Sequence, residues 1–214
     1  MNKTKRMTET AVCLSIGVAL ELVSSLIPFL SLPFGGSFTF ASMLPIVWIA
    51  YRYGTKWGLF SGFVFSLLQM LTGIKTVSAF FMPGSDSYEG FWRALCICAL
   101  DYLLAFTVLG LAGVFRNAKT PSKALCIGSI FALGLRYIVH IISGTVFFGA
   151  WAEWFFTQDG FYAIGGKILD TFSGTSLSVV YSIFYNGLFM IPEIIITAIA
   201  AFAIGKIKQF SIKY

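Results

Sequence analysis

The sequence predicts an all-α polytopic membrane protein, with residues 1–214 forming a single domain and a bundle of six transmembrane helices. Three observations support this prediction. Hydrophobic residues make up 57% of the chain and charged residues only 11%, whereas a soluble domain carries about 25% charged residues. The mean hydropathy is +0.84, which favours lipid as the surrounding solvent. Apolar runs also alternate with short clusters of lysine and arginine, as expected for membrane helices and their loops.

The six spans are expected at residues 7–30, 40–54, 57–74, 92–115, 121–150 and 178–207. The first run is long enough to cross a membrane and lacks the small-residue cleavage site of a signal peptide, so we interpret it as a retained helix. Pro33 and the Gly35-Gly36 pair that follow it predict a turn. The second run contains Pro45 and, like the third, is short for an upright span, which is tolerated where neighbouring helices cover the backbone.

The later spans carry their own boundary signals. Thr120 and Pro121 are typical of an N-cap residue followed by a first-turn proline, and they mark the start of the fifth span. Pro192 lies inside the sixth span and predicts a kink there. Two long outer loops are expected at about residues 74–91 and 151–177. The second is rich in aromatic residues and glycine, which fits either a binding lid or an aromatic belt at the membrane interface.

The distribution of basic residues sets the expected orientation. Eleven basic residues fall on one side of the six-span arrangement: Lys3, Lys5, Arg6, Arg52, Lys56, Arg116, Lys119, Lys123, Lys206, Lys208 and Lys213. Only Lys75, Arg93 and Lys167 fall on the other side. Because cytoplasmic loops carry the excess of lysine and arginine, both termini are predicted to be cytoplasmic. The same clustering explains the net charge of +6 better than nucleic-acid binding does, so no nucleic-acid partner is expected.

Five ionisable residues fall inside the expected spans: Glu21, Asp101, Arg136, His140 and Glu193. Such groups are costly in lipid and are functional candidates by default. Glu193 follows Pro192 and is a candidate to satisfy backbone groups freed at that proline. No role is assigned to Glu21.

Four polar residues from three spans are expected at a similar depth. Asp101 lies nine residues in from the outer end of the fourth span, and His140 lies ten residues before the outer end of the fifth. Tyr181 and Asn186 are three and eight residues into the sixth span. At a rise of about 1.5 Å per residue, all four lie within roughly 15 Å of the outer surface. This coincidence predicts a pocket that opens outward.

The residue types in this pocket favour an organic cation as the ligand. Asp101 supplies a carboxylate, and Tyr102 lies beside it in a chain that holds 23 Phe, 9 Tyr and 5 Trp. Charge pairing and cation–π attraction together recognise such cations. Arg136 and His140 are four residues apart and share a helix face, and the histidine and Asn186 offer directional hydrogen bonds.

Structural alternatives remain open for three of these residues. Asp101 could form an ion pair with Arg136 that serves only the scaffold. His140 could be a core histidine with its hydrogen bonds satisfied, and Tyr181 could be an anchor at the membrane interface.

Sequence motifs that the chain lacks also restrict its function. It has no GxxxxGK[ST] phosphate loop, so it is not expected to power transport itself. It has no HExxH, GxSxG or zinc-type cysteine spacing, so neither catalysis, a metal nor a cofactor is expected.

Two predicted helices carry small residues at intervals of four: Ala11, Ser15 and Ala19 in the first, and Gly58, Gly62 and Ser66 in the third. Such stripes let helices approach closely in lipid, either within the bundle or against a partner.

Several motifs together carry a family resemblance: residues 8–11 (TETA), 100–102 (LDY), 110–115 (GLAGVF), 136–149 (RYIVHIISGTVFFG) and 181–186 (YSIFYN). In these the chain resembles the thiamine-specific S components of energy-coupling factor (ECF) transporters, bacterial membrane proteins that bind a vitamin for a shared ATP-driven module. The histidine-containing block is the most specific of the motifs.

The resemblance implies a six-helix bundle of the ECF S-component type in the bacterial plasma membrane, with a thiamine site near the outer face. The implied ligand-binding residues are Asp101, Tyr102, Arg136, His140, Phe148, Trp151, Tyr181 and Asn186. The carboxylate would engage the cationic ligand, and Phe148 and Trp151 would build an aromatic wall. The stripe of Ala11, Ser15 and Ala19 would face the transmembrane coupling subunit, which works with two ATPase subunits. Ser15 departs from the alanine usual at its position.

Two other functions were weighed against this one. The first is an S component for another small vitamin such as riboflavin, but a neutral flavin has no need of Asp101. The second is a membrane enzyme, which would have to use His140, the only histidine, with no recognisable nucleophile motif.

Overall fold

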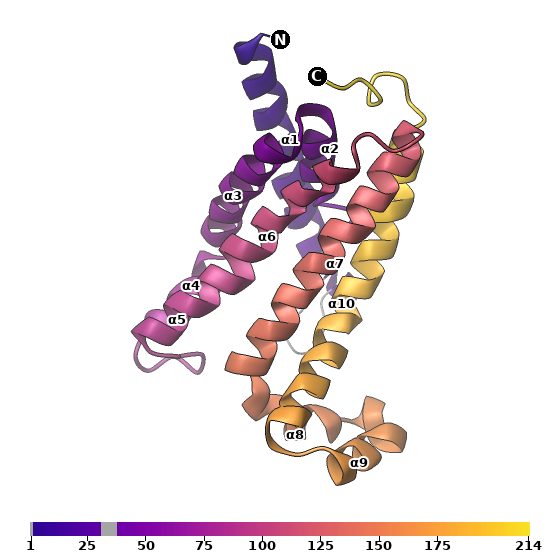
Figure 1. Ribbon diagram of the computed structural model, residues 1–214. Helices are drawn as coiled ribbons and strands as arrows, with labels where there is room; N and C mark the ends of the chain where they lie inside the picture. Colours follow the sequence, from indigo (N-terminus) through magenta and orange to yellow (C-terminus); the bar gives the residue numbers. More distant parts are fainter. Residues whose placement is uncertain (1, 31–37) are drawn as a thin grey trace.

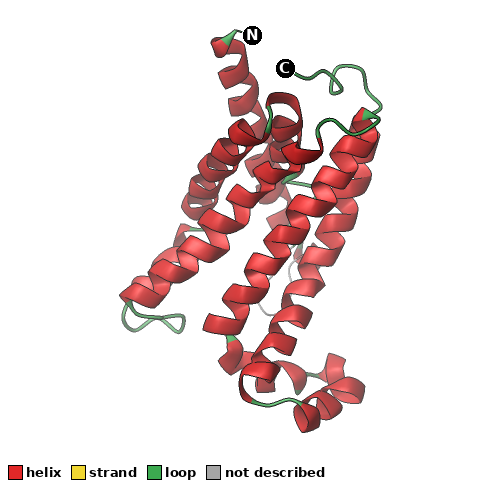
Figure 2. Ribbon diagram, viewed as in Figure 1, coloured by secondary structure: helices red, strands yellow, loops and turns green. Residues whose placement is uncertain are grey.

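The computed structural model describes residues 2–30 and 38–214, and these residues form helices and connecting turns without a β-strand (Figure 2). The predicted turn at Pro33 and Gly35-Gly36 lies outside the described residues. The α-helices are α1 (Lys3–Ser25), α2 (Leu44–Tyr53), α3 (Thr55–Thr72), α4 (Ile74–Phe81), α5 (Phe91–Ile97), α6 (Ala105–Thr107), α7 (Pro121–Phe147), α8 (Ala152–Phe156), α9 (Tyr162–Thr171) and α10 (Gly174–Ile204). A π-helical turn, η2 (Cys98–Leu104), joins α5 to α6, and the 3-10 helix η3 (Val108–Phe115) continues α6. Three short 3-10 turns, η1 (Pro28–Leu30), η4 (Gly149–Trp151) and η5 (Asp159–Phe161), complete the described elements.

Four of the described helical segments are long and apolar enough to cross a membrane: α1, the continuous run Phe91–Phe115, α7 and α10. A fifth is possible if α3 and α4 count as one span, although they are bent by 78° at their junction. The all-α membrane fold predicted from the sequence is therefore confirmed. Six spans remain a prediction, because α2 has only ten residues.

The helix boundaries follow local chemistry. Thr120 has extended backbone angles, and its side chain accepts a hydrogen bond from the backbone N–H of Lys123, which makes it the predicted N-cap of α7. Pro121 is the first helical residue. The helix α10 continues through Pro192 to Ile204. The expected outer loops are partly helical, since α4 lies in the first and α8 and α9 lie in the second.

Close backbone approach holds α3 against the run that contains α6 and η3. Gly58, Gly62 and Ser66 of the α3 stripe are all buried. A Cβ atom on Gly62 would overlap the carbonyl oxygen of Phe106, and one on Gly110 would overlap the backbone of Leu59. This stripe therefore packs inside the bundle, because only glycine fits where two backbones meet. By contrast, Ala11, Ser15 and Ala19 of α1 are exposed.

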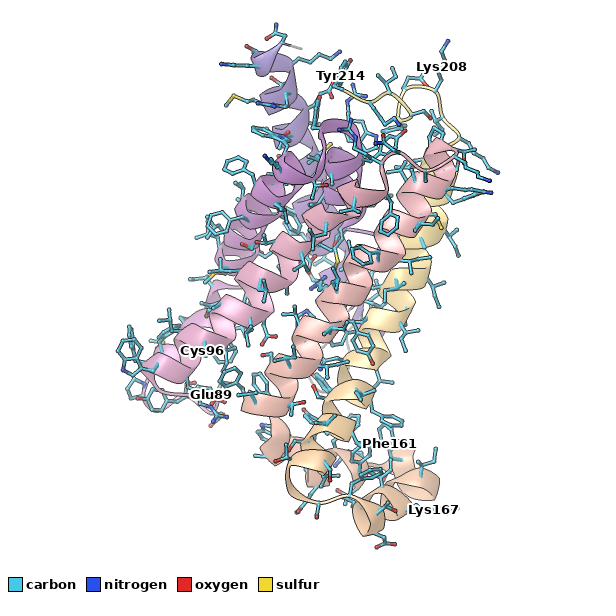
Figure 3. All side chains as sticks on the ribbon, viewed as in Figure 1. Glu89, Cys96, Phe161, Lys167, Lys208 and Tyr214 are labelled. Atoms are coloured by element: carbon cyan, nitrogen blue, oxygen red, sulfur yellow. The ribbon has the colours of Figure 1, made fainter. Side chains whose placement is uncertain are left out.

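The two termini meet at one end of the bundle (Figures 1 and 3). Lys5 Nζ donates a hydrogen bond of 3.1 Å to the Tyr214 hydroxyl, and Arg116 Nη2 donates one of 2.7 Å to the Tyr214 carbonyl. Nearby, Arg52 forms an ion pair with Glu9 at 2.7 Å and so ties α2 to α1. The helices α8 and α9 lie at the opposite end (Figure 1). A cytoplasmic position for the termini remains a prediction.

Candidate functional site

Asp101 and His140 form the centre of the candidate site. Asp101 lies in the π-helical turn η2, an irregularity that often occurs at functional positions. Its Oδ1 atom is 2.9 Å from Nδ1 of His140 on α7, and its Oδ2 atom accepts a 2.7 Å hydrogen bond from the hydroxyl of Ser143. Both carboxylate oxygens are thus held by side chains of one neighbouring helix.

Arg136 lies on the same face of α7, one turn before His140. Its Nε–H donates to His140 Nε2 at 3.2 Å, and its guanidinium lies 4.2 Å from the centre of the Phe106 ring. It also contacts the sulfur of Met43. The ion pairs among the described residues do not join Arg136 to Asp101, so the alternative of a purely structural pair between them is wrong.

An aromatic cavity of about 530 Å³ opens beside this centre. Predicted site residues on its wall are Asp101, His140, Phe148, Trp151, Tyr181 and Asn186. Aromatic residues that the sequence did not single out for the site also line it: Phe80, Trp154, Phe155, Tyr185 and Phe189. The volume lies within the range of about 300–1,000 Å³ typical of small-molecule sites.

Ring contacts fix the wall of the aromatic cavity. The centroid of the Tyr181 ring is 5.3 Å from that of Phe155 and 5.6 Å from that of Tyr185. Trp151 and Trp154 pack edge to face at 5.8 Å. Tyr181 is only 6% exposed, so it belongs to this wall, and its interpretation as an interfacial anchor is wrong.

Asn186 lines the aromatic cavity and also joins two helices. Its Nδ2 atom donates to the carbonyl oxygens of His140 at 3.2 Å and Ser182 at 2.8 Å. It therefore helps to set the position of α7 relative to α10 at the level of His140.

A second, polar cavity of about 490 Å³ lies on the other side of the same centre. Asp101 and His140 line both cavities. The predicted site residues Tyr102 and Arg136 line the polar cavity but not the aromatic one. Glu21, Gln69 and Glu193 line it with them.

The two remaining intramembrane carboxylates anchor the segment that leads into α2. Glu193 is 1% exposed and accepts hydrogen bonds from the backbone N–H of Thr39 at 2.6 Å and from its hydroxyl. Glu21 accepts one from the Ser42 hydroxyl at 3.0 Å. Glu193 thus satisfies a backbone N–H, as expected, but one brought in from a distant part of the chain.

Ser143 is the functional candidate that sequence reasoning missed. Its signal was present, because Arg136, His140 and Ser143 are spaced by four and three residues and share one helix face. No group of three or more His, Cys, Asp and Glu residues in the described parts of the chain is arranged to hold a metal ion.

The fold and the site define a helical membrane protein with ligand-sized cavities between its helices. The chain belongs to the Thiamine transporter protein family (Thia_YuaJ), whose model matches residues 7–83 and 87–154. It is 32% identical to the "Thiamine transporter ThiT" of Bacillus subtilis (strain 168) over 216 residues, which covers 93% of this chain and 91% of that protein. Family membership confirms the prediction of a transport protein rather than an enzyme.

The fold also matches a solved structure of ThiT from Listeria monocytogenes. The TM-score is 0.60 at 24% sequence identity, with 96% of this chain and 97% of that chain covered. The likeness shows a shared fold.

Proposed function

We propose that this chain is the substrate-binding subunit, or S component, of an ATP-driven ECF importer and that it captures thiamine. The observation that carries the proposal is the Asp101 carboxylate, which is held by His140 and Ser143 on the wall of an aromatic cavity. The names of the family and of the relatives support the identity of the vitamin.

The chemistry of the aromatic cavity suits this ligand. The thiazolium ring of thiamine is permanently cationic, so a carboxylate attracts it at every physiological pH. Aromatic faces such as those of Trp151 and Tyr181 add cation–π attraction. The polar groups of Asp101 and His140 supply directional contacts for a heterocycle. A neutral vitamin such as riboflavin would gain nothing from the charge.

Energy for uptake would come from partner subunits, because the sequence has no phosphate loop. The exposed small residues Ala11, Ser15 and Ala19 of α1 are the proposed contact with the transmembrane coupling subunit, which would join the chain to two ATPase subunits. We place the protein in the bacterial plasma membrane with the end that carries Lys5, Arg52 and Arg116 facing the cytoplasm, as the excess of basic residues suggests.

Calorimetric titration of the purified full-length protein without nucleotide tests the proposal. We expect saturable heat with thiamine and none with riboflavin under the same conditions. Clear heat with riboflavin and none with thiamine would overturn the substrate. Turnover of thiamine by the isolated chain would overturn the binding-subunit role.

A further inference from the structure

Arg136 is a buried cation whose hydrogen bond is made to a histidine. It is 8% exposed, and no carboxylate of the described residues lies within ion-pair distance of it. The carboxylates Glu21 and Glu193 line the polar cavity with it. Its Nε–H points at His140 Nε2 at 3.2 Å.

This contact determines where the hydrogen of His140 lies. A guanidinium only donates hydrogen bonds, so Nε2 of His140 must accept and carries no hydrogen. A neutral imidazole then carries its hydrogen on Nδ1, which lies 2.9 Å from Oδ1 of Asp101 and donates to it. In the other tautomer, or in the imidazolium, an N–H on Nε2 would face the N–H of Arg136, and two donors would meet.

The protonation state of His140 decides how much charge Asp101 presents to the cavities. An imidazolium at 2.9 Å would pair with the carboxylate and cancel its charge. Neutral His140 and the Ser143 hydroxyl hold the two oxygens by hydrogen bonds without cancelling it. Since the carboxylate also lines the aromatic cavity, its charge stays available there.

We infer that Arg136 is a positioning residue for the ligand site. It holds His140 neutral, with the hydrogen on Nδ1, and so reserves the negative charge of Asp101 for a cationic ligand. Only this last step rests on the proposed function. The tautomer follows from the contacts of Arg136 and Asp101 with His140.

Because His140 is the only histidine, nitrogen-15 NMR of histidine-labelled protein reports on it alone. In the ligand-free, full-length wild type we expect one protonated nitrogen, Nδ1, and one unprotonated nitrogen, Nε2. Arg136→Met removes the donor but keeps an apolar stem against Phe106. In this variant we expect the unprotonated Nε2 signal to be lost and thiamine affinity to fall about tenfold, a loss typical of one charged hydrogen bond. Arg136→Lys retains a charged donor and should restore much of both.

The outcomes separate this inference from the proposed function. A wild-type spectrum with hydrogen on Nε2, or on both nitrogens, overturns the inference without need of a variant that folds. Weakened binding with an unchanged His140 spectrum in Arg136→Met also overturns it, because Arg136 then acts on the ligand directly. A wild type with the expected spectrum that fails to bind thiamine refutes the proposed function and leaves the tautomer assigned.

Discussion

Asp101→Asn distinguishes a carboxylate that binds a cation from one that only supports the fold. The amide has nearly the same shape, so the change removes mainly charge. Asparagine keeps one oxygen to accept from His140 Nδ1, and its NH₂ group can donate to the Ser143 hydroxyl, which is free to rotate. We therefore expect the free energy of unfolding to fall by only about 1 kcal/mol.

The effect on thiamine affinity should be much larger. Removal of one partner from a buried, hydrogen-bonded charge pair costs about 2–5 kcal/mol. The Asp101 side chain is 20% exposed, so it is only partly desolvated and the lower half of that range applies. A loss of about 2–3 kcal/mol corresponds to roughly 30- to 200-fold weaker binding.

The assay measures thiamine affinity by calorimetry and melting temperature on the same purified variant. Ser143→Ala is the matched control, because it removes a hydrogen bond to Oδ2 but leaves the charge, and it should weaken binding about fivefold. A neutral thiamine analogue with a thiophene in place of the thiazolium should bind wild type and Asp101→Asn almost equally. An unchanged thiamine affinity with a sharply lowered melting temperature would refute the reasoning and place Asp101 in the scaffold.

Much of the fold could be predicted from the sequence because hydrophobicity determines it directly. The apolar runs at 92–115 and 121–150 match the observed Phe91–Phe115 and Pro121–Phe147 closely. The third run was harder, since hydropathy does not report direction. It was expected to span residues 57–74 as one helix, whereas the chain turns by 78° between α3 and α4.

The centre of the site could be predicted because buried charge is rare in lipid, which marks Asp101 and His140 individually. Their contact adds what a count of depth along each helix cannot provide, namely which way each side chain points. The same limit explains why Tyr102 and Arg136 were grouped with Tyr181, although they line a different cavity. That division depends on the π-helical turn, which changes helix phase and has no signal in the composition.

Three further predictions test the packing, the partner surface and the cavity. Gly110→Ala should lower the melting temperature because its Cβ would overlap Leu59, whereas Gly134→Ala, with nothing within 4 Å, should leave it unchanged or raise it; equal effects would contradict the packing argument. Ala19→Trp should block uptake but not thiamine binding, while Ile138→Trp on exposed α7 should block neither, and normal uptake in Ala19→Trp would argue against docking through α1. Finally, thiamine should quench tryptophan fluorescence through Trp151, which lines the aromatic cavity, and not through Trp48, which contacts Phe210 at the end where the termini meet. Trp151→Phe should therefore remove much of the quenching and Trp48→Phe little of it. The reverse result would place the ligand at the opposite end of the bundle, away from Asp101.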